Sequence, residues 1–331
     1  MKIPQSRDGS SVQKSRPAHP MFPSVCQTFR ILWGFIESDF LTFAVPNSAF
    51  GLLGALAGSR LLNGPPPLPV EVLRRSPAVL FFNFYSLLIF DLANQYPPES
   101  VEEDRVNKPW RPIPSGLVTS EQARQAMLLT APVCLAANYM LGLWNEGLLV
   151  QVLSYYYNEL NGGGGLFRDA IIAVSYGLAN RASLKLATGP ENVVSVSGHA
   201  WTAIVSGIIL TTMHIQDLKD QRGDRKLRRK TLPLFLGDGL CRIALAILIP
   251  FWSLVNVGFW NLGFMSSSSY CLLAVLISKR VLTKREKQDD ARIWKLWCFW
   301  LTSLYALPLL TRSGVEEKWG VIRPLDFGNA M

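Results

Sequence analysis

The sequence predicts an all-α fold, a polytopic membrane helical bundle of about nine transmembrane helices. Of its 331 residues 49% are hydrophobic, and the mean hydropathy is positive, which is more apolar than an average soluble domain. Several apolar stretches approach the roughly 20 residues that a membrane-spanning helix needs. In chain order, the expected spans are residues 38–59, 76–93, 122–143, 146–158, 169–188, 199–216, 239–260, 264–279 and 293–311. The fourth is short and the fifth contains charges, so eight spans remain an alternative.

The distribution of Lys and Arg supports this order of spans. With nine spans, 25 of the 33 Lys and Arg residues fall on the face that carries the N-terminus, 6 fall on the other face, and 2 lie inside the fifth span. Because positive charge marks cytoplasmic loops, the N-terminal face is predicted to be cytoplasmic. Both acidic clusters of the chain lie on that face. We therefore expect a multi-pass integral membrane protein with its site facing the cytoplasm, in an endomembrane such as the endoplasmic reticulum.

Charge and composition also limit the function and the domain organisation. The net charge of +9 does not indicate nucleic-acid binding, because the cations lie in short loops between apolar runs. Residues 1–35 are expected to form a polar N-terminal tail, residues 36–312 the transmembrane catalytic domain, and residues 313–331 a short C-terminal tail. The five cysteines match no zinc or redox spacing, and no segment indicates an obligate protein partner.

The second acidic cluster follows the sixth expected span. If that helix continues, Asp217, Asp220 and Asp224 lie on one face, at i, i+3 and i+7. Three like charges on one face repel each other, and a bound divalent cation removes the repulsion. Magnesium fits, since it accepts carboxylate oxygens, waters and substrate phosphates together. Arg225 follows and is a candidate for binding diphosphate. The alternative is a solvated loop with ion pairs to residues such as Lys219.

The first acidic cluster, residues 91–104, follows the second expected span. Pro97 and Pro98 prevent a continuous helix through it. We expect the span to end near Asn94 and a turn to present the acidic run. The candidate metal ligands of this cluster are Glu99, Glu103 and Asp104. A solvated loop is again the alternative, but two such clusters on one face favour a metal–diphosphate site.

Cationic residues near the clusters are candidates for holding the diphosphate. Lys108 and Arg111 lie in a stiff proline-rich segment after the first cluster, where Arg can bind phosphate through two hydrogen bonds and Lys acts as a point charge. Arg181 and Lys185 are four residues apart inside the fifth span, on one helix face. A cation within a span is costly and indicates a functional cavity, so we expect these two to stabilise the leaving diphosphate. The alternative is that one of them reaches the membrane interface.

These residues resemble a known family. Residues 94–96 and 104–116 resemble the first Asp-rich motif of the UbiA superfamily and its trailing Asn-x-Pro-x-Arg-Pro-Ile-Pro segment. Residues 217–224, followed by Thr231-Leu232-Pro233, are similar to the second motif. The resemblance implies a helical membrane bundle with a lateral cavity, in which two Mg²⁺ ions bridge both motifs to a prenyl diphosphate. Carried over by position, it implies polar and metal-binding roles for Asn94, Asp104, Asp217, Asp220 and Asp224, with Glu99 as the carboxylate between Asn94 and Asp104.

The first motif departs from the usual family pattern. Gln95 stands where the first Asp is expected, and the spacing from Asn94 to Asp104 is about two residues longer. This altered motif looks more like the fungal UbiA-type terpene cyclases of secondary metabolism. The resemblance therefore implies a membrane-embedded, Mg²⁺-dependent cyclase that ionises a linear prenyl diphosphate and cyclises the carbocation.

Two other functions remain open at this stage. A UbiA-type prenyltransferase would share the ionisation step but pass the prenyl group to a second bound molecule. A transporter or lipid-binding membrane protein would use the charged residues within the membrane instead. In either enzyme, apolar and aromatic walls must shield the cation from water. Aromatic residues that could supply such faces are Phe81, Phe82, Phe84, Tyr85, Phe90, Tyr155, Tyr156, Tyr157 and Tyr176.

Overall fold

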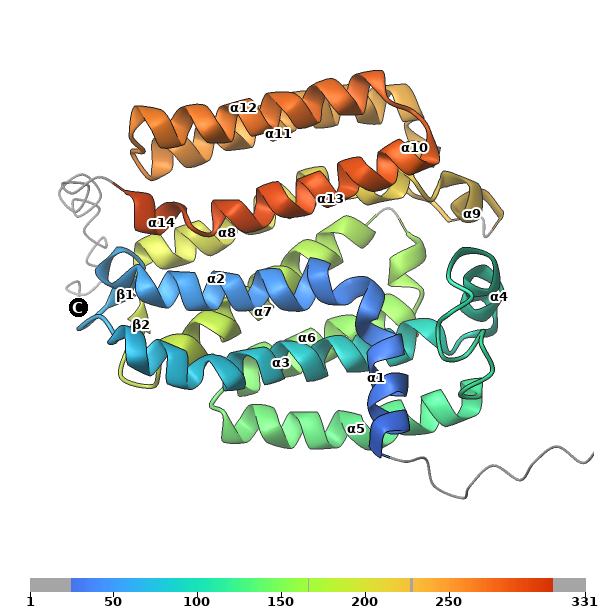
Figure 1. Cartoon of the computed structure of the whole chain (residues 1–331). Coiled ribbons are helices and arrows are strands. Elements are labelled where there is room, and N and C mark those ends of the chain that lie inside the picture. The colour runs from blue at the N-terminus through green and yellow to red at the C-terminus, as the bar shows by residue number, and fades with distance from the viewer. Residues whose placement is uncertain (1–24, 166, 227–228, 312–331) are drawn as a thin grey trace, which may run out of the picture.

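The computed structural model describes residues 25–165, 167–226 and 229–311, which form an almost entirely helical bundle (Figure 1). Its long helices are α1 (Val25–Asp39), α2 (Val45–Leu56), α3 (Pro69–Gln95), α5 (Ser120–Met140), α6 (Trp144–Asn158), α7 (Arg168–Thr188), α8 (Val196–Thr212), α11 (Asp238–Phe259), α12 (Phe264–Thr283) and α13 (Lys287–Leu304). The all-α prediction is confirmed. Each of the nine expected spans overlaps one of these helices.

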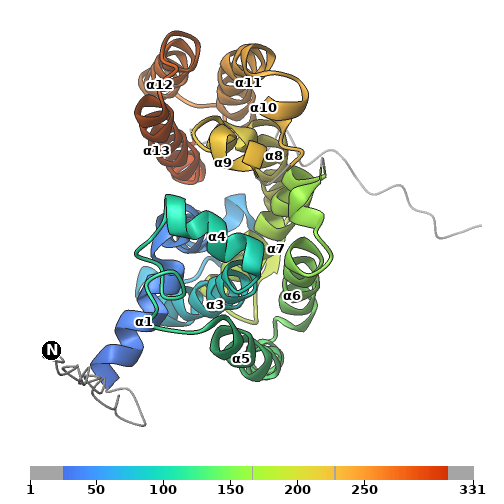
Figure 2. The same ribbon diagram turned by 90° about the vertical axis from the view of Figure 1, so that its right-hand side faces the viewer.

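Shorter elements lie at the two ends of the bundle. The short α-helices are α4 (Pro98–Asn107), α9 (Gln221–Lys226), α10 (Leu232–Phe235) and α14 (Leu307–Leu310). A π-helical segment, Phe40–Ala44, joins α1 to α2, and 3₁₀ segments occupy Gly58–Arg60, Gly162–Gly164 and Met213–Leu218. Strands β1 (Leu62–Asn63) and β2 (Val193–Val194) pair antiparallel, with Leu62 opposite Val194. Figures 1 and 2 place α4, α9 and α10 together at the end opposite these strands.

Helix α1 begins earlier than the expected domain boundary. Residues 25–35, assigned to the N-terminal tail from their sequence, are helical, and the side chains of Phe35 and Ile36 are buried. The helix is held against α3, because the Gln95 side chain donates a hydrogen bond of 2.7 Å to the backbone oxygen of Phe35. This long-range bond has no signature in the local sequence. Residues 1–24 and 312–331, which hold the rest of the two expected tails, lie outside the described residues.

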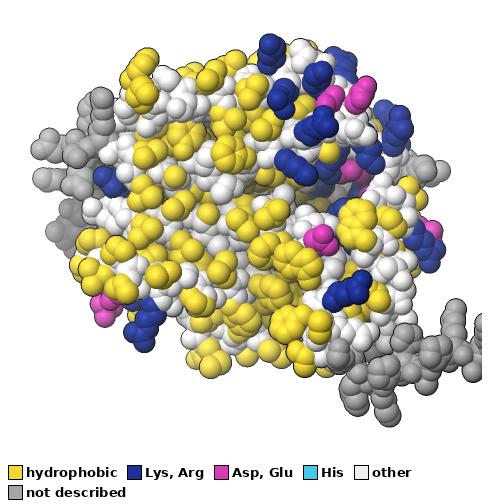
Figure 3. Space-filling view, viewed as in Figure 1, with side chains coloured by type: hydrophobic (Ala, Val, Ile, Leu, Met, Phe, Trp, Pro, Cys, Tyr) yellow, Lys and Arg dark blue, Asp and Glu magenta, His cyan; other side chains and the backbone are white. Residues whose placement is uncertain are grey.

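Four helical segments of the described chain are long and apolar enough to cross a membrane: Val25–Leu56, Pro69–Gln95, Val196–Leu218 and Asp238–Phe259. The expected count of nine spans is therefore not confirmed. The outer surface nevertheless carries large apolar side chains, such as Leu129 and Leu272, which are 72% and 71% exposed. In Figure 3, hydrophobic side chains cover the middle of the visible face, and charged side chains gather towards the end that carries α4 and α9. This surface suits a lipid environment better than water.

Small residues allow the central helices to pack closely. A Cβ atom added at Gly51 on α2 would lie 2.5 Å from the backbone carbonyl of Ser183 on α7. Asn83 on α3 donates hydrogen bonds to the hydroxyl groups of Ser48 (3.1 Å) and Ser183 (2.8 Å). Close backbone approach and such polar bonds are the main attractions between helices in membranes, because apolar burial against lipid contributes little. Helices α2, α3 and α7 thus form the centre that positions the rest.

A buried ionic network joins the C-terminal helices. Arg242 on α11 pairs with Asp290 on α13 through two hydrogen bonds of 2.9 Å, and also with Asp238. Its guanidinium reaches the backbone oxygens of Val281 and Lys284 as well. Arg242 and Asp290 are 1% and 2% exposed. Because every charge is paired, the network fixes α13 relative to α11.

We predict that Asp290→Ala destabilises the protein by about 3 kcal/mol, since it leaves the buried Arg242 charge poorly compensated. Thermal unfolding of the purified protein in detergent, followed by tryptophan fluorescence, measures this. Asp289→Ala is the matched control, because Asp289 is only half-buried and reaches the exposed Arg292 at 3.6 Å. Equal melting temperatures for the two variants would contradict the assignment.

Candidate active site

The two acidic segments meet at one end of the bundle. Arg229, after α9, pairs with Glu103 on α4 at 2.9 Å and with Asp224 on α9 at 3.4 Å. A Cβ atom added at Gly223 would lie 3.1 Å from the side-chain nitrogen of Asn107 on α4. The segments are more than a hundred residues apart in sequence, yet α4 and α9 lie at the same end of the bundle (Figures 1 and 2) and are bridged by Arg229.

The second segment does not continue the helix before it. Helix α8 ends at Thr212, a 3₁₀ segment spans Met213–Leu218, and α9 begins at Gln221. The expectation of one continuous helix face for the three aspartates is therefore wrong. Backbone hydrogen bonds from Asp220 to Asp217 and from Asp224 to Asp220 still keep the segment coiled. Tertiary packing at the end of α8 overrides the local periodicity.

The first segment is more regular than expected. Pro97 and Pro98 end α3, as predicted, but Pro98 then starts the short helix α4 instead of a turn. Proline is favourable in the first helical turn, where its missing N–H is not needed. As a result Asp104 faces inward and is buried, whereas Glu99 faces outward and is exposed. Glu103, half-buried, faces the second segment.

Arginine side chains hold the predicted metal-binding carboxylates. Arg111 binds both oxygens of Asp104, at 2.8 and 3.1 Å, and reaches Asp39 at 3.3 Å. Arg168, at the start of α7, contacts Asp217 at 2.5 Å and donates to the Tyr157 hydroxyl at 3.0 Å. With Arg229, each acidic segment has an arginine partner. Charge-assisted pairs of this kind are strong.

These pairs keep the carboxylates from converging on one point. Within the described residues, no three His, Cys, Asp or Glu side chains are placed to hold one metal ion together. The donor chemistry still suits Mg²⁺, which prefers carboxylate oxygens and needs only one or two from the protein. One oxygen of the buried Asp224 also has no hydrogen-bond partner. This oxygen is available to a cation without breaking an ion pair.

Local electrostatics favour such a cation. Burial, followed by the charge of Asp217, raises the pKa of Asp224 to about 6, and Arg229 only partly offsets this. Burial alone would lower the pKa of Arg111, but the charges of Asp39 and Asp104 raise it above its usual value. The negative charge of the carboxylates at this site is therefore only partly balanced by the neighbouring arginines.

Four further predicted site residues also lie at this end of the bundle. Asn94 donates to the side-chain oxygen of Asn158 on α6 at 3.0 Å. Lys108 is half-buried near Asp91 and Arg111, Asp220 pairs with Lys219, and Arg225 is exposed. These residues lie on or beside the two acidic segments. Their assigned roles stay predictions.

Arg181 and Lys185 lie elsewhere. Both pair with the buried Glu146 on α6, at 3.1 and 3.0 Å. Arg181 is 13 residues along α7 from Arg168, which corresponds to about 20 Å of helix. The structure therefore does not bring these two cations to the acidic segments, and their charge is balanced by a partner that sequence reasoning did not identify.

The structure also adds residues that sequence reasoning missed. Arg229 belonged to a loop of many cations, Arg168 was the single cation of its short loop, and Asp39 lay at the start of an expected span. Asp91 and Asp169 are 1% and 6% exposed, and none of their carboxylate oxygens has a hydrogen-bond partner. Asp91 opens the first acidic cluster in the sequence but was not among its candidate metal ligands. Gln95, the residue that departs from the usual motif, is fully buried and directed at α1.

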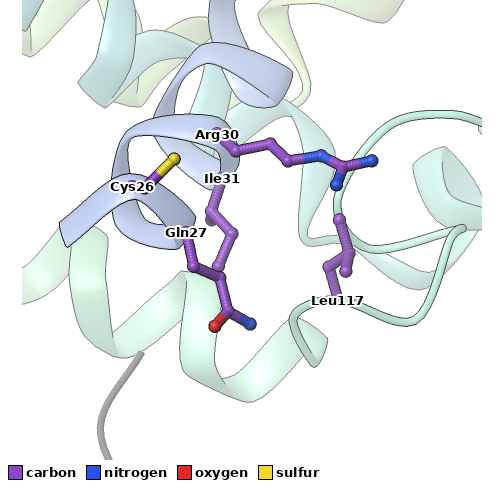
Figure 4. Close-up of a pocket in the computed structure, with 5 residues that line it drawn as sticks. All are labelled: Cys26, Gln27, Arg30, Ile31 and Leu117. Carbon is purple, nitrogen blue, oxygen red and sulfur yellow. The ribbon is translucent and has the colours of Figure 1, made fainter. Parts of the chain in front are cut away.

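A surface pocket of about 270 Å³ lies away from this site (Figure 4). It is lined by four residues of α1 and one residue of the loop after α4: Cys26, Gln27, Arg30, Ile31 and Leu117. None of the predicted site residues lines it. The acidic end of the bundle therefore remains the candidate active site.

Comparisons with known proteins identify the family. The model of the UbiA prenyltransferase family matches residues 50–303, so the chain belongs to that family of enzymes. A solved UbiA homologue from Archaeoglobus fulgidus, bound to GPP and Mg²⁺, has a similar fold, with a TM-score of 0.57 and 13% identity over 86% of this chain and 99% of that one.

Three curated relatives extend over nearly the whole chain. Somaliensene A/B synthase of Streptomyces somaliensis is 30% identical over 87% of this chain and 95% of its own length. Two proteins of Hericium erinaceus are each 27% identical. Diterpene cyclase eriG matches 92% of this chain and 96% of its own length, and polyprenyl transferase eriF matches 89% and 99%.

We predict that Arg229→Ala loosens the contact between α4 and α9, because it leaves Glu103 and the buried Asp224 without their shared partner. The expected cost is about 1 kcal/mol, since Arg229 is partly exposed. Hydrogen exchange should speed up in both helices. Arg225→Ala, an exposed neighbour, is the control, and unchanged exchange in Arg229→Ala would refute the bridge.

Proposed function

We propose that the protein is a membrane-embedded terpene cyclase that ionises a linear prenyl diphosphate and closes the resulting carbocation into a ring. The observation that carries the proposal is the meeting of the two acidic segments around Arg229. The named activities of somaliensene synthase and eriG support the cyclase reading. We place the protein in an endomembrane with this site towards the cytoplasm, as the distribution of Lys and Arg suggests.

The reaction begins at the bond between the allylic carbon and the diphosphate oxygen. That bond breaks with its electron pair leaving on the diphosphate, so negative charge grows on the leaving group. Arg168, Arg229 and Lys108 are within reach of the acidic segments and can take up this charge, which is electrostatic catalysis at the leaving group. A bound Mg²⁺ would supply further positive charge for the phosphate oxygens. The carboxylates that we assign to hold it are Glu103, Asp104, Asp217, Asp220 and Asp224, whereas Glu99, the remaining candidate from the sequence, is exposed on α4.

The carbocation that remains needs a dry, electron-rich environment. The rings of Phe90 on α3 and Tyr157 on α6 lie 5.2 Å apart, and the Tyr157 hydroxyl contacts Arg168 beside Asp217. This aromatic pair is thus next to the proposed leaving-group site. A cation over such a ring gains roughly 0.5–2 kcal/mol. The alkene of the same prenyl chain then attacks the cation, and loss of a proton completes a cyclic hydrocarbon.

The second candidate is a prenyltransferase, in which an aromatic or other small acceptor attacks the cation. The observation that favours it is the match to eriF, which is as similar to this chain as eriG is. Both reactions share the ionisation step, so the acidic end of the bundle does not distinguish them. Transport or lipid binding has no comparable support among the relatives.

We predict that the purified protein releases a cyclic hydrocarbon from a prenyl diphosphate without any acceptor. Fifteen- and twenty-carbon radiolabelled substrates are supplied separately with Mg²⁺, and products are identified by mass spectrometry. A strict requirement for an added acceptor would establish the prenyltransferase instead. Ionisation of neither substrate would contradict both enzyme functions.

We further predict that Asp104→Ala, Asp217→Ala and Asp220→Ala each lower diphosphate release by about a hundredfold or more, the usual effect of removing one electrostatic contributor. Pyrophosphate release is measured for variants whose melting temperatures stay near that of the wild type. Asp289→Asn, on the surface of α13, is the control for loss of one negative charge. Near-normal rates for all three alanine variants would refute the site.

A further inference from the structure

Asp169 is a buried carboxylate that the mechanism above does not use. It is the second residue of α7, its side chain is 6% exposed, and neither carboxylate oxygen has a hydrogen-bond partner. Asp169 lies in the first turn of α7, where the helix N-terminus favours a negative charge, but its carboxylate accepts no hydrogen bond from the helix end. Burying an unpaired carboxylate is unfavourable, so the position needs a compensating partner.

Arg168, the cation that acts on Asp169 electrostatically, makes its direct contacts elsewhere. Arg168 precedes Asp169 in the chain, but the Arg168 guanidinium contacts Asp217 at 2.5 Å and the Tyr157 hydroxyl at 3.0 Å. Asp169 and Asp217 act on each other electrostatically as like charges, and Asp224 is also within range of Asp217. At the start of α7, the carboxylates of Asp169 and Asp217 therefore share one arginine, Arg168.

A second group in this neighbourhood is also unsatisfied. His214, at 4% exposure, lies in the 3₁₀ segment that carries Asp217. Its ring nitrogens make no hydrogen bond of good geometry, although the backbone of Cys241 lies close to the ring. Unpaired buried polar atoms are rare in folded proteins and commonly mark an ion or water. Asp169 and His214 therefore both leave buried polar atoms unpaired beside Asp217, where a bound cation could engage them.

We propose that Asp169 is a further carboxylate ligand for the divalent cation of the second acidic segment, and that it shares this cation with Asp217. This inference rests on the proposed function, which requires such a cation. When a diphosphate binds, Arg168 can exchange Asp217 for phosphate oxygens, and both carboxylates then face the metal. A ligand from α7 would also couple cation binding to the helix that lies at the centre of the bundle.

The test uses Mn²⁺ as the probe and does not depend on turnover. Free Mn²⁺ is measured by electron paramagnetic resonance while it is titrated into purified protein, with and without a non-ionisable thiolo analogue of a prenyl diphosphate. Asp169→Asn should weaken Mn²⁺ binding by at least about tenfold. Asp217→Asn should weaken it similarly, and Asp289→Asn should leave it unchanged.

Thermal unfolding is an independent measurement, because a ligand role and a structural role for Asp169 change the metal-free melting temperature in opposite directions. Without metal, Asp169→Asn should raise the melting temperature, because it removes an unpaired buried charge next to Asp217. With saturating Mn²⁺, the variant should gain less stability than the wild type does. A purely structural role for Asp169 would lower the metal-free melting temperature and leave Mn²⁺ affinity intact.

The outcomes separate this inference from the proposed function. If Asp217→Asn loses Mn²⁺ and Asp169→Asn keeps wild-type affinity, Asp169 is not a ligand, while the metal–diphosphate site stands. If the wild type binds no Mn²⁺ in either condition, the inference fails together with the metal dependence of the proposed reaction. Weaker binding in both variants, with the control unchanged, supports the inference.

Discussion

A surplus of buried carboxylates over arginines at one end of the bundle is the constraint on which the candidate site depends. Asp104, Asp217 and Asp224 each contact an arginine, whereas Asp91 and Asp169 are buried without hydrogen-bond partners. Folding tolerates this arrangement because the arginine pairs neutralise part of the charge. The remaining deficit of positive charge is what makes the site suitable for a divalent cation and a diphosphate. The same pairs that stabilise the ligand-free protein are the ones that ligand binding can exchange.

The rest of the fold serves to bring these charges together in an apolar setting. Close packing at Gly51 and the hydrogen bonds of Asn83 fix α2, α3 and α7, and α7 carries Arg168 and Asp169 at its start. The apolar outer surface leaves the charged end as the natural place for a polar headgroup. A prenyl diphosphate has this same polarity, with a charged head and a hydrocarbon tail. This agreement in polarity supports the substrate class that we propose.

The structure shows what the altered residue of the first motif does. Gln95 stands where the family pattern has an aspartate, and its amide ties α3 to the backbone of α1. The carboxylates near this position are instead Asp91, one turn earlier on α3, and Asp39, at the end of α1, both of which act on Arg111. The negative charge of the first segment is therefore distributed differently, and α1 becomes part of the site's support. Cyclase and transferase would share this end, so their difference must lie in how the apolar space beyond it is shaped.

Local sequence determined the helical class, the two acidic segments and the helix end at Pro97 and Pro98, because apolar runs and proline act through short-range physics. Residue type in the sequence also singled out Asp104, Asp217 and Asp224 as candidates, and the structure places all three at the end of the bundle where the acidic segments meet. Only the tertiary structure decided which charges meet. Arg181 and Lys185 were expected at the diphosphate, but both find Glu146 on a neighbouring helix, while Arg168 and Arg229 take the places beside the acidic segments. Ion pairs between distant segments depend on helix rotation and packing distance, and neither quantity is encoded in the spacing of residues along the chain.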